Sequence, residues 1–372
     1  MTMKLLFILS FFVFLFSITG YSQSTNDVLN VLIQRKLITQ EDADSMRSEA
    51  AIKQQETDAK RKSFQVTASK LFQLDGYTQL RYQFFDEPVK FDGFDIRRAY
   101  IGLRGSINPY WGYRLQADFA NSPRLMDAYA EFKYNDYINV QFGQTLLPFS
   151  LENLTSNSKT DFIDRSQIIE SLVSRKGDVI GDQNGRDIGV QAGGVLLKLN
   201  GKSLVDYKIG LFNGAGINGG DKNKTKDVVA RIVIHPFTGL DLGASYYDGV
   251  GNYGTPADNK GRNRLGAELS YEWSSLSIKG EYIKGKDGII NREGYYAQAG
   301  YYVIPQKLQF LAKLDSFDPD TDIDNNKLSW YVAGLNLYLN QNVRFQFNYS
   351  FREEEGTNVK NNVACAQLQI HF

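Results

Sequence analysis

Cysteine and histidine are almost absent from this 372-residue chain. One Cys and two His rule out a disulfide framework and a metal site rich in these residues, so we expect no metal and no cofactor. A basic excess is also missing, because 42 Lys and Arg balance 42 Asp and Glu, and nothing points to a nucleic-acid partner. Apolar residues make up 42% and aromatic residues 13%, which is too rich in strand formers for a disordered chain.

Long apolar runs are missing except at the N-terminus. Lys4 precedes a mainly apolar run over residues 5–18, and small residues follow it up to Ser22. A basic residue, an apolar core and small residues in this order are typical of a signal peptide, which we assign to residues 1–22. The run is shorter than the about 20 residues that a membrane helix needs. We therefore expect an exported chain that no α-helix holds in a membrane.

Residues 23–68 contain no glycine and follow a helical pattern. Apolar side chains between Val28 and Ile33 recur at helical spacing. Thr39 with Asp42 resembles a capping box, although that box prefers Glu or Gln at its last position. We predict a short periplasmic helical hairpin or stalk for residues 23–68. A partly disordered linker is the alternative.

From about Leu74 to the last residue, within a domain that we assign to residues 69–372, the apolar period changes to two. Trp111, Tyr113 and Leu115, for example, alternate with glycine, arginine and glutamine, and the last such run ends on Phe372. Sixteen runs of this kind, separated by turns, are typical of a transmembrane β-barrel. Lipid offers the backbone no hydrogen-bond partner, so the sheet must close on itself. The predicted fold is all-β: a 16-stranded antiparallel transmembrane β-barrel preceded by the helical segment.

Short and long connections alternate along the barrel, with Asn121–Arg124 as the one exception. Short turns on one rim and long loops on the other are what outer-membrane barrels show, with the turns toward the periplasm. The short ones are Asn108-Pro109, Asn135-Asp136, Asn200–Ser203, His235–Gly239, Ser274-Ser275, Pro305–Lys307 and Asn340–Asn342. The long ones are Phe85–Gly93, Pro148–Gly185, Asn213–Lys226, Asp248–Arg262, Gly285–Glu293, Asp318–Asn326 and Glu353–Asn361.

Charged residues in mid-strand indicate which face points inward. A Lys or Arg on the lipid face near mid-membrane would cost about 2–4 kcal/mol. Sixteen strands enclose an interior too wide for side chains to fill, so we expect an aqueous channel that lets small hydrophilic solutes diffuse through the outer membrane. The residues expected to point inward are Arg81, Arg98, Arg104, Arg114, Glu131, Arg231, Glu268, Lys279, Glu281, Lys313 and Arg344.

Several segments, taken together and in order, resemble the phosphate-selective porin O and P family. They cover most of residues 74–372, and no single one decides the match. The segments are Ile96–Gly105 (IRRAYIGLRG), Gly143-Gln144, Pro148–Glu152, Thr155-Ser156, Gly185–Val190, Asn213–Asp227 and Asp315–Asp320.

The resemblance implies a homotrimer of barrels, each with its own pore. It also implies that the Pro148–Gly185 loop folds inward to narrow the channel, and that the terminal Phe372 is read by the assembly machinery. Anions would bind an inward ladder of Arg and Lys, which at matching positions means Arg98, Arg104 and Arg186. The chain departs from the family pattern where Lys313 stands in place of an expected Arg. This keeps the charge but loses the planar fork that grips phosphate in two places.

The balance of inward charges leaves two functions open. Arg and Lys rings select anions, which favours small anions such as phosphate as the solute. Mixed charges on the later strands fit a non-selective general diffusion porin equally well, and a structural or adhesin barrel is a weaker alternative. The candidate pore-lining and anion-contacting residues are Arg81, Arg98, Arg104, Arg114, Arg165, Arg186, Arg231, Lys313 and Arg344.

The other motifs in the sequence indicate no function of their own, and we expect no enzyme. Gly214–Gly219 matches G-x-G-x-x-G, but a dinucleotide site needs a helix directly after the motif. The aspartates between Asp318 and Asp324 lack the Gly and Glu of an EF-hand. His235, expected in a turn, has no neighbouring ligand set in the sequence, and Cys365 has no partner for nucleophilic chemistry.

Overall fold

The chain divides into two units, Met1–Ala68 and Ser69–Phe372. The computed structural model describes residues 32–35, 37, 39, 42, 71–357 and 359–372. The predicted signal peptide (residues 1–22) lies outside the described residues, and so does most of the predicted stalk (residues 23–68). Among the residues described, none of the helices combines the length and the apolarity needed to cross a bilayer.

One detail of the first unit agrees with the sequence pattern. The hydroxyl of Thr39 accepts a hydrogen bond from the Asp42 N–H (3.1 Å), and the Asp42 carboxylate accepts one from the Thr39 N–H (3.0 Å). Reciprocal bonds of this kind define a capping box.

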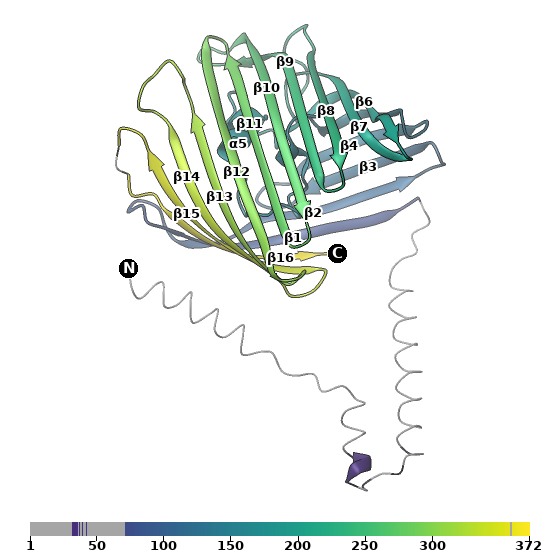
Figure 1. Ribbon diagram of the computed structural model, residues 1–372. Helices are drawn as coiled ribbons and strands as arrows, with labels where there is room; N and C mark the ends of the chain where they lie inside the picture. The colour runs from purple at the N-terminus through teal and green to yellow at the C-terminus, as the bar shows by residue number, and fades with distance from the viewer. Residues whose placement is uncertain (1–31, 36, 38, 40–41, 43–70, 358) are drawn as a thin grey trace. The chain divides into compact units, whose positions relative to one another are not determined.

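In the second unit, the described residues form a closed barrel of sixteen antiparallel strands, in which β1 pairs with both β2 and β16 (Figure 1). This confirms the predicted fold class. The strands are β1 (Gln73–Phe85), β2 (Gly93–Ser106), β3 (Trp111–Asp118), β4 (Arg124–Lys133), β5 (Asn139–Leu146), β6 (Arg186–Leu199), β7 (Lys202–Phe212), β8 (Asp227–Phe237), β9 (Leu240–Tyr253), β10 (Asp258–Trp273), β11 (Leu276–Asp287), β12 (Ile290–Ile304), β13 (Leu308–Asp318), β14 (Leu328–Tyr338), β15 (Val343–Glu354) and β16 (Val363–His371).

Side chains alternate between the two faces of the wall. Leu80 and Phe310 are exposed on the outer face, where lipid favours them. Gln79, Asn336 and Gln346 are buried inside the barrel. The polar interior therefore forms a hydrogen-bonded lining rather than an apolar core.

The long and short connections fall largely where the sequence places them, with two corrections. Most of the predicted loop Asp248–Arg262 is strand, because β9 and β10 pair up to Tyr253 and Asp258. The predicted loop Gly285–Glu293 is a hairpin between β11 and β12 that closes at Gly288-Ile289. Both segments are polar and glycine-rich like loops, yet their backbone ladders continue, because pairing between strands does not depend on side-chain polarity.

Two β-bulges change which side chains face inward. The β1–β2 register shifts between Gln79 and Leu80, and Arg97 is the extra residue on β2. The β3–β4 register shifts between Gln116 and Ala117, and Met126 is the extra residue on β4. A bulge turns the extra side chain away from strict alternation. Arg97 therefore joins Arg98 in the lumen, although alternation alone would place it toward lipid.

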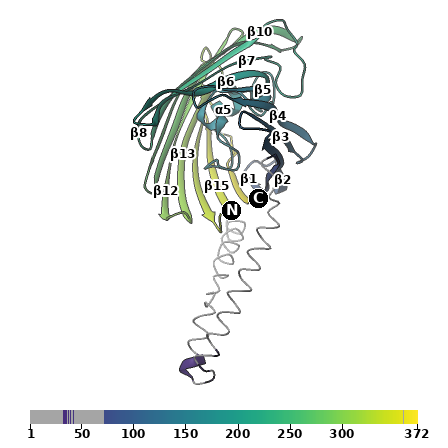
Figure 2. The ribbon, with the colours of Figure 1, turned by 90° about the vertical axis from the view of Figure 1, so that its right-hand side faces the viewer.

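The connection from β5 to β6 enters the barrel. It carries two short helices, α4 (Leu151–Leu154) and α5 (Gln167–Leu172), and Figure 2 shows α5 within the ring of strands. Apolar side chains attach it to the inner wall in a cluster that is closed to solvent. The loop contributes Leu147, Phe149, Ile168, Ile169, Leu172 and Val173, and the wall contributes Phe212, Val229, Tyr247, Ile283, Tyr296 and Phe317.

Candidate functional site

Neutral amides fasten the inward loop to one half of the wall. Gln79 on β1 donates to the Asn157 carbonyl (3.1 Å), and Gln369 on β16 donates to the Ser158 carbonyl (3.1 Å). Asn336 and Gln346, on β14 and β15, both donate to the Asp161 carbonyl at 3.0 Å. These amides also bond to one another across the strands. These bonds hold the loop against β1, β14, β15 and β16 through uncharged side chains.

Two of the predicted anion-contacting cations support this loop. Lys313 donates to the Asp164 carbonyl (3.3 Å), and Arg344 donates to the carbonyls of Thr160 (3.0 Å) and Ser158 (3.1 Å). Both side chains are buried, with residue exposures of 5%. In this structure both cations are bonded to backbone carbonyls of the inward loop.

Strand carboxylates hold the N-termini of both loop helices. Glu281 on β11 accepts from the N–H groups of Leu151 (3.0 Å) and Glu152 (2.7 Å) at the start of α4. Asp315 on β13 accepts from the Gln167 N–H (2.9 Å) at the start of α5. The first N–H groups of a helix have no partner within the helix, so a carboxylate there satisfies them. These contacts place both helices against the β11–β13 wall.

A cationic latch holds the loop where it meets β1 and β2. Asp164 lies 2.7 Å from Arg97 and 3.7 Å from Arg81, and Arg81 also pairs with Asp95 at 2.5 Å. Burial alone would raise the pKa of Asp164, but Arg97 and Arg81 outweigh it and hold that pKa below its usual value. Arg81, a predicted anion contact, is therefore paired with carboxylates.

A cavity of about 240 Å³ lies between the loop and the β1–β6 wall. The wall contributes Tyr77, Tyr100, Arg114, Gln116, Asp127, Tyr129, Thr145, Leu146 and Arg186, and the loop contributes Asn153, Leu154, Thr155, Ser156, Asn157, Arg165 and Arg175.

Charges on the wall side of the cavity are mostly paired. Arg186 binds Asp127 at 2.7 Å, and Arg114 lies 3.5 Å from Asp127 and 3.0 Å from Asp75. Arg98, directly next to this wall, donates to Gln79 at 2.9 Å and has no carboxylate within 4 Å among the described residues.

Charges on the loop side of the cavity are not paired. Arg165 donates to the Glu152 and Thr155 carbonyls and to Asn157, and Arg175 donates to Asn153 (2.7 Å). Within the described part of the chain neither makes a salt bridge, although their exposures are only 4% and 2%. Burial and the neighbouring Arg165 lower the pKa of Arg175 to about 9. Glu152 and Glu170 act on these guanidiniums only from beyond salt-bridge distance.

The cavity continues toward the short-turn rim. A wider space of about 670 Å³ shares Tyr77, Arg114 and Ser156 with it and reaches the turn at Asn108. Arg104 lines this wider space, is 58% exposed in its side chain and lies 3.5 Å from Asp75. A passage therefore leads from the short-turn rim to the unpaired arginines.

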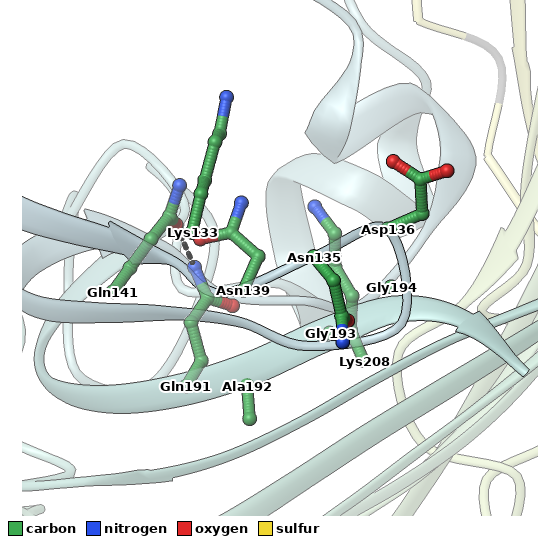
Figure 3. A pocket seen from close by; sticks show the side chains of 10 residues that line it. All are labelled: Lys133, Asn135, Asp136, Asn139, Gln141, Gln191, Ala192, Gly193, Gly194 and Lys208. Carbon is green, nitrogen blue, oxygen red and sulfur yellow. Dashed lines mark hydrogen bonds between the residues drawn. The ribbon is translucent and has the colours of Figure 1, made fainter. Parts of the chain in front are cut away.

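A side hollow of about 330 Å³ opens beside this passage near the turn between β4 and β5 (Figure 3). Lys133, which also borders the wider space, and Lys208 supply amino groups to it. Gln191 donates to Gln141 at 2.7 Å across its floor, as the dashed line shows. The hollow adds polar, mainly basic surface to the short-turn end of the passage.

Arg231, the last of the predicted anion contacts, and His235 lie on β8, outside the lining of these spaces. Arg231 on β8 is paired with Glu268 on β10. His235, expected in a turn without partners, lies in β8, and its ring nitrogens contact Asp241 (2.6 Å) and Asp206 (3.1 Å). No cluster of His, Cys, Asp and Glu in the described residues could hold a metal ion.

A closed sixteen-strand barrel with an inward loop and a polar passage is the architecture of an outer-membrane porin, a channel for solutes. The chain belongs to the family described as phosphate-selective porin O and P, whose model matches residues 72–250 and 243–372.

Individual proteins show the same relationship at greater distance. Salmonella typhi OmpF, solved in complex with daunomycin, is 13% identical with a TM-score of 0.61 over 81% of this chain and 97% of its own. Vibrio cholerae OmpT, solved in a trimer form, is 11% identical with a TM-score of 0.57 over 81% of this chain and 100% of its own. An uncharacterized protein of Aquifex aeolicus (strain VF5) is 24% identical over 296 residues, covering 67% of this chain and 68% of the relative.

Proposed function

We propose that this porin passes small hydrophilic solutes with a preference for anions, phosphate among them. The observation that carries the preference is the pair of buried, unpaired guanidiniums, Arg165 and Arg175, on the loop side of the 240 Å³ cavity. Taking a charge out of water costs several kcal/mol unless an opposite charge compensates it. An anion that enters the cavity supplies that charge, so the site favours anions over cations.

The chemistry of the cavity favours oxyanions. Guanidinium groups donate two parallel N–H bonds to phosphate or carboxylate oxygens. Arg175 and Arg186 line the cavity from the loop and from the wall, so an oxyanion there lies between two guanidiniums, of which Arg186 is already bonded to Asp127. The family name supports phosphate as one such solute.

A general diffusion porin is the alternative that the same passage allows. Asp127 and Asp75 line it and neutralise Arg186 and Arg114 in part. If these carboxylates cancel the field of the loop arginines, the channel passes cations and anions equally.

Reversal potentials in a planar bilayer under a KCl gradient distinguish the two functions. We expect an anion-selective potential for the wild type, and a shift toward zero selectivity for Arg175→Gln and Arg165→Gln. Lys198→Gln is the matched control, because it removes the same charge from the turn region, where Lys198 pairs with Asp136. A wild-type potential in both arginine variants would contradict the proposal.

We also propose that the chain assembles as a homotrimer through the β3–β5 wall. Strands β3 and β5 have only 8 residues each, whereas β10 has 16. A transmembrane strand needs about 9–11 residues, so this wall is too short to face lipid across its full height. A neighbouring copy of the chain would cover it, as the trimer form of the OmpT structure supports.

A further inference from the structure

The glycine-rich segment Gly214–Gly219 belongs to the loop between β7 and β8 and has a structural reason for its composition. Gly214 (φ 75°), Gly216 (φ 80°) and Asn218 (φ 57°) all adopt the left-handed backbone conformation. A Cβ on Gly216 would also overlap the Gln183 side chain. Three left-handed residues within five curl the chain tightly, and side chains other than Asn and Gly rarely allow this. The segment, which we call the strap, is built to turn inward.

The curl carries one apolar side chain into the barrel. Ile217 is 7% exposed and packs in a cluster with Met126, Tyr100 and Tyr77. Tyr77 and Tyr100 also line the 240 Å³ cavity that contains Arg165 and Arg175, which we call the arginine cavity. The rings of these two tyrosines lie 4.9 Å apart. The strap comes from the long-loop side, whereas the wider space reaches the short-turn rim, so Ile217 contacts the two tyrosines from the side away from that opening. Met126 reaches the cluster because it is the extra residue of the β3–β4 bulge.

A small set of hydrogen bonds holds the strap in place, and one of them joins it to a carboxylate: the Gly214 N–H donates to Asp187 at 2.7 Å. The Asn218 N–H donates to Gln144 (2.7 Å), Gln144 donates back to Asn218 (3.2 Å), and the Asn218 amide donates to the Leu125 carbonyl (3.0 Å). The Ile217 N–H donates to Gln183 (3.1 Å). Apart from the bond to Asp187, these bonds join neutral groups, so the strap has fewer charged and apolar contacts than the inward loop with its salt bridges and apolar core.

We infer that Ile217 is an apolar gate over the arginine cavity, and that the strap must lift for a solute to pass between the long-loop side and the unpaired arginines. Apolar constrictions stop ions because a hydrated ion cannot shed its water there without replacement partners. The gate and the arginines then have separate effects. The arginines determine whether anions or cations pass, and Ile217 determines the conductance. The inference rests on the proposed passage.

Single-channel recording separates the two roles. We expect Ile217→Ser to raise the mean conductance by about twofold or more, because a polar residue removes the dewetted barrier. Asn218→Ala, which removes two of the bonds that hold the strap, should raise it in the same direction. Ile217→Leu keeps an apolar plug and is the matched control, which should conduct like the wild type.

The reversal potential distinguishes failure of the gate from failure of the filter. We expect it to stay at the wild-type value in both the serine and the alanine variants, since no cavity charge changes. Unchanged conductance in Ile217→Ser and Asn218→Ala overturns the gate and leaves the proposed anion preference intact. A wild-type protein without ion selectivity overturns the filter instead, and the conductance comparison still tests the gate.

Discussion

The apolar attachment of the inward loop can be broken at one side chain. Ile168 on α5 has no exposed surface and lies in the cluster that joins the loop to the wall. It fits over Gly294 on β12, where an added Cβ would overlap the Ile168 side chain. Truncation to alanine therefore leaves an unfilled space against a rigid strand, and the wall has no side chain at Gly294 that could move into it.

The free-energy cost of Ile168→Ala follows from this geometry. Replacing a fully buried Ile by Ala destabilises packing by about 2–5 kcal/mol. The barrel ladder does not include this contact, so the cost falls on docking of the loop rather than on barrel formation. Since each 1.4 kcal/mol is a factor of ten, even the lower value multiplies the undocked fraction of the loop by about 30.

Two measurements check this expectation. In a planar bilayer, Ile168→Ala should show noisier openings and excursions to higher conductance than the wild type. Protease added to the folded protein should cut between α4 and α5 faster. Ile232→Ala, which removes the same atoms from the half-exposed outer face, is the control for a general effect on the barrel. Wild-type conductance noise together with wild-type protease resistance in Ile168→Ala would show that the apolar cluster does not hold the loop.

Two more perturbations test the latch and the subunit wall. The depressed pKa of Asp164 means that its bonds to Arg97 stabilise the docked loop above the unfolded-state pKa of about 3.9 and are lost as pH falls through the lower folded value. The frequency of wild-type channel openings and closings should therefore not change between about pH 5 and 8. Asp164→Asn should show at pH 7 the opening frequency that the wild type shows only in strong acid. Equal opening frequencies of the two proteins at pH 7 would argue against the latch. Phe142→Lys, on the exposed outer face of β5, should convert trimers to monomers on unheated gels, while Phe310→Lys on β13 should not. Trimers that survive the β5 change would place the interface elsewhere.

Alternation was sufficient to predict the barrel because lipid on one side and water on the other act on every second residue. The hairpins beyond the membrane band were harder to predict. Around Asn252 and Asn259 both faces meet water, so polarity no longer reports the strand, and only the paired backbones Asp258–Tyr253 and Asn259–Asn252 define it. The sequence therefore predicted loops where the ladder continues.

The bulge at Arg97 left a signal that alternation misses. Arg97 and Arg98 are adjacent, so strict alternation would place one of them toward lipid at a cost of about 2–4 kcal/mol. Two neighbouring arginines in mid-strand are thus an argument for an extra residue. The structure places both inside, with Arg97 on Asp164. The prediction that included Arg98 alone missed the residue that holds the loop.

Charge counting could not assign roles to the lumen arginines, because the role depends on which partner the folded loop brings within reach. Arg231 on β8 pairs with Glu268 on β10, and the order of the strands is enough to predict this pair. Arg344, in contrast, donates hydrogen bonds to carbonyls of a loop about 185 residues earlier in the chain. No local pattern in the sequence predicts these bonds. Arg175 was missed as a site residue for the same reason: its sequence neighbours include carboxylates, and only the path of the loop separates it from them and turns it toward the cavity. The proposed anion preference therefore rests on the guanidiniums that folding leaves without a carboxylate within 4 Å, and not on the total number of inward arginines.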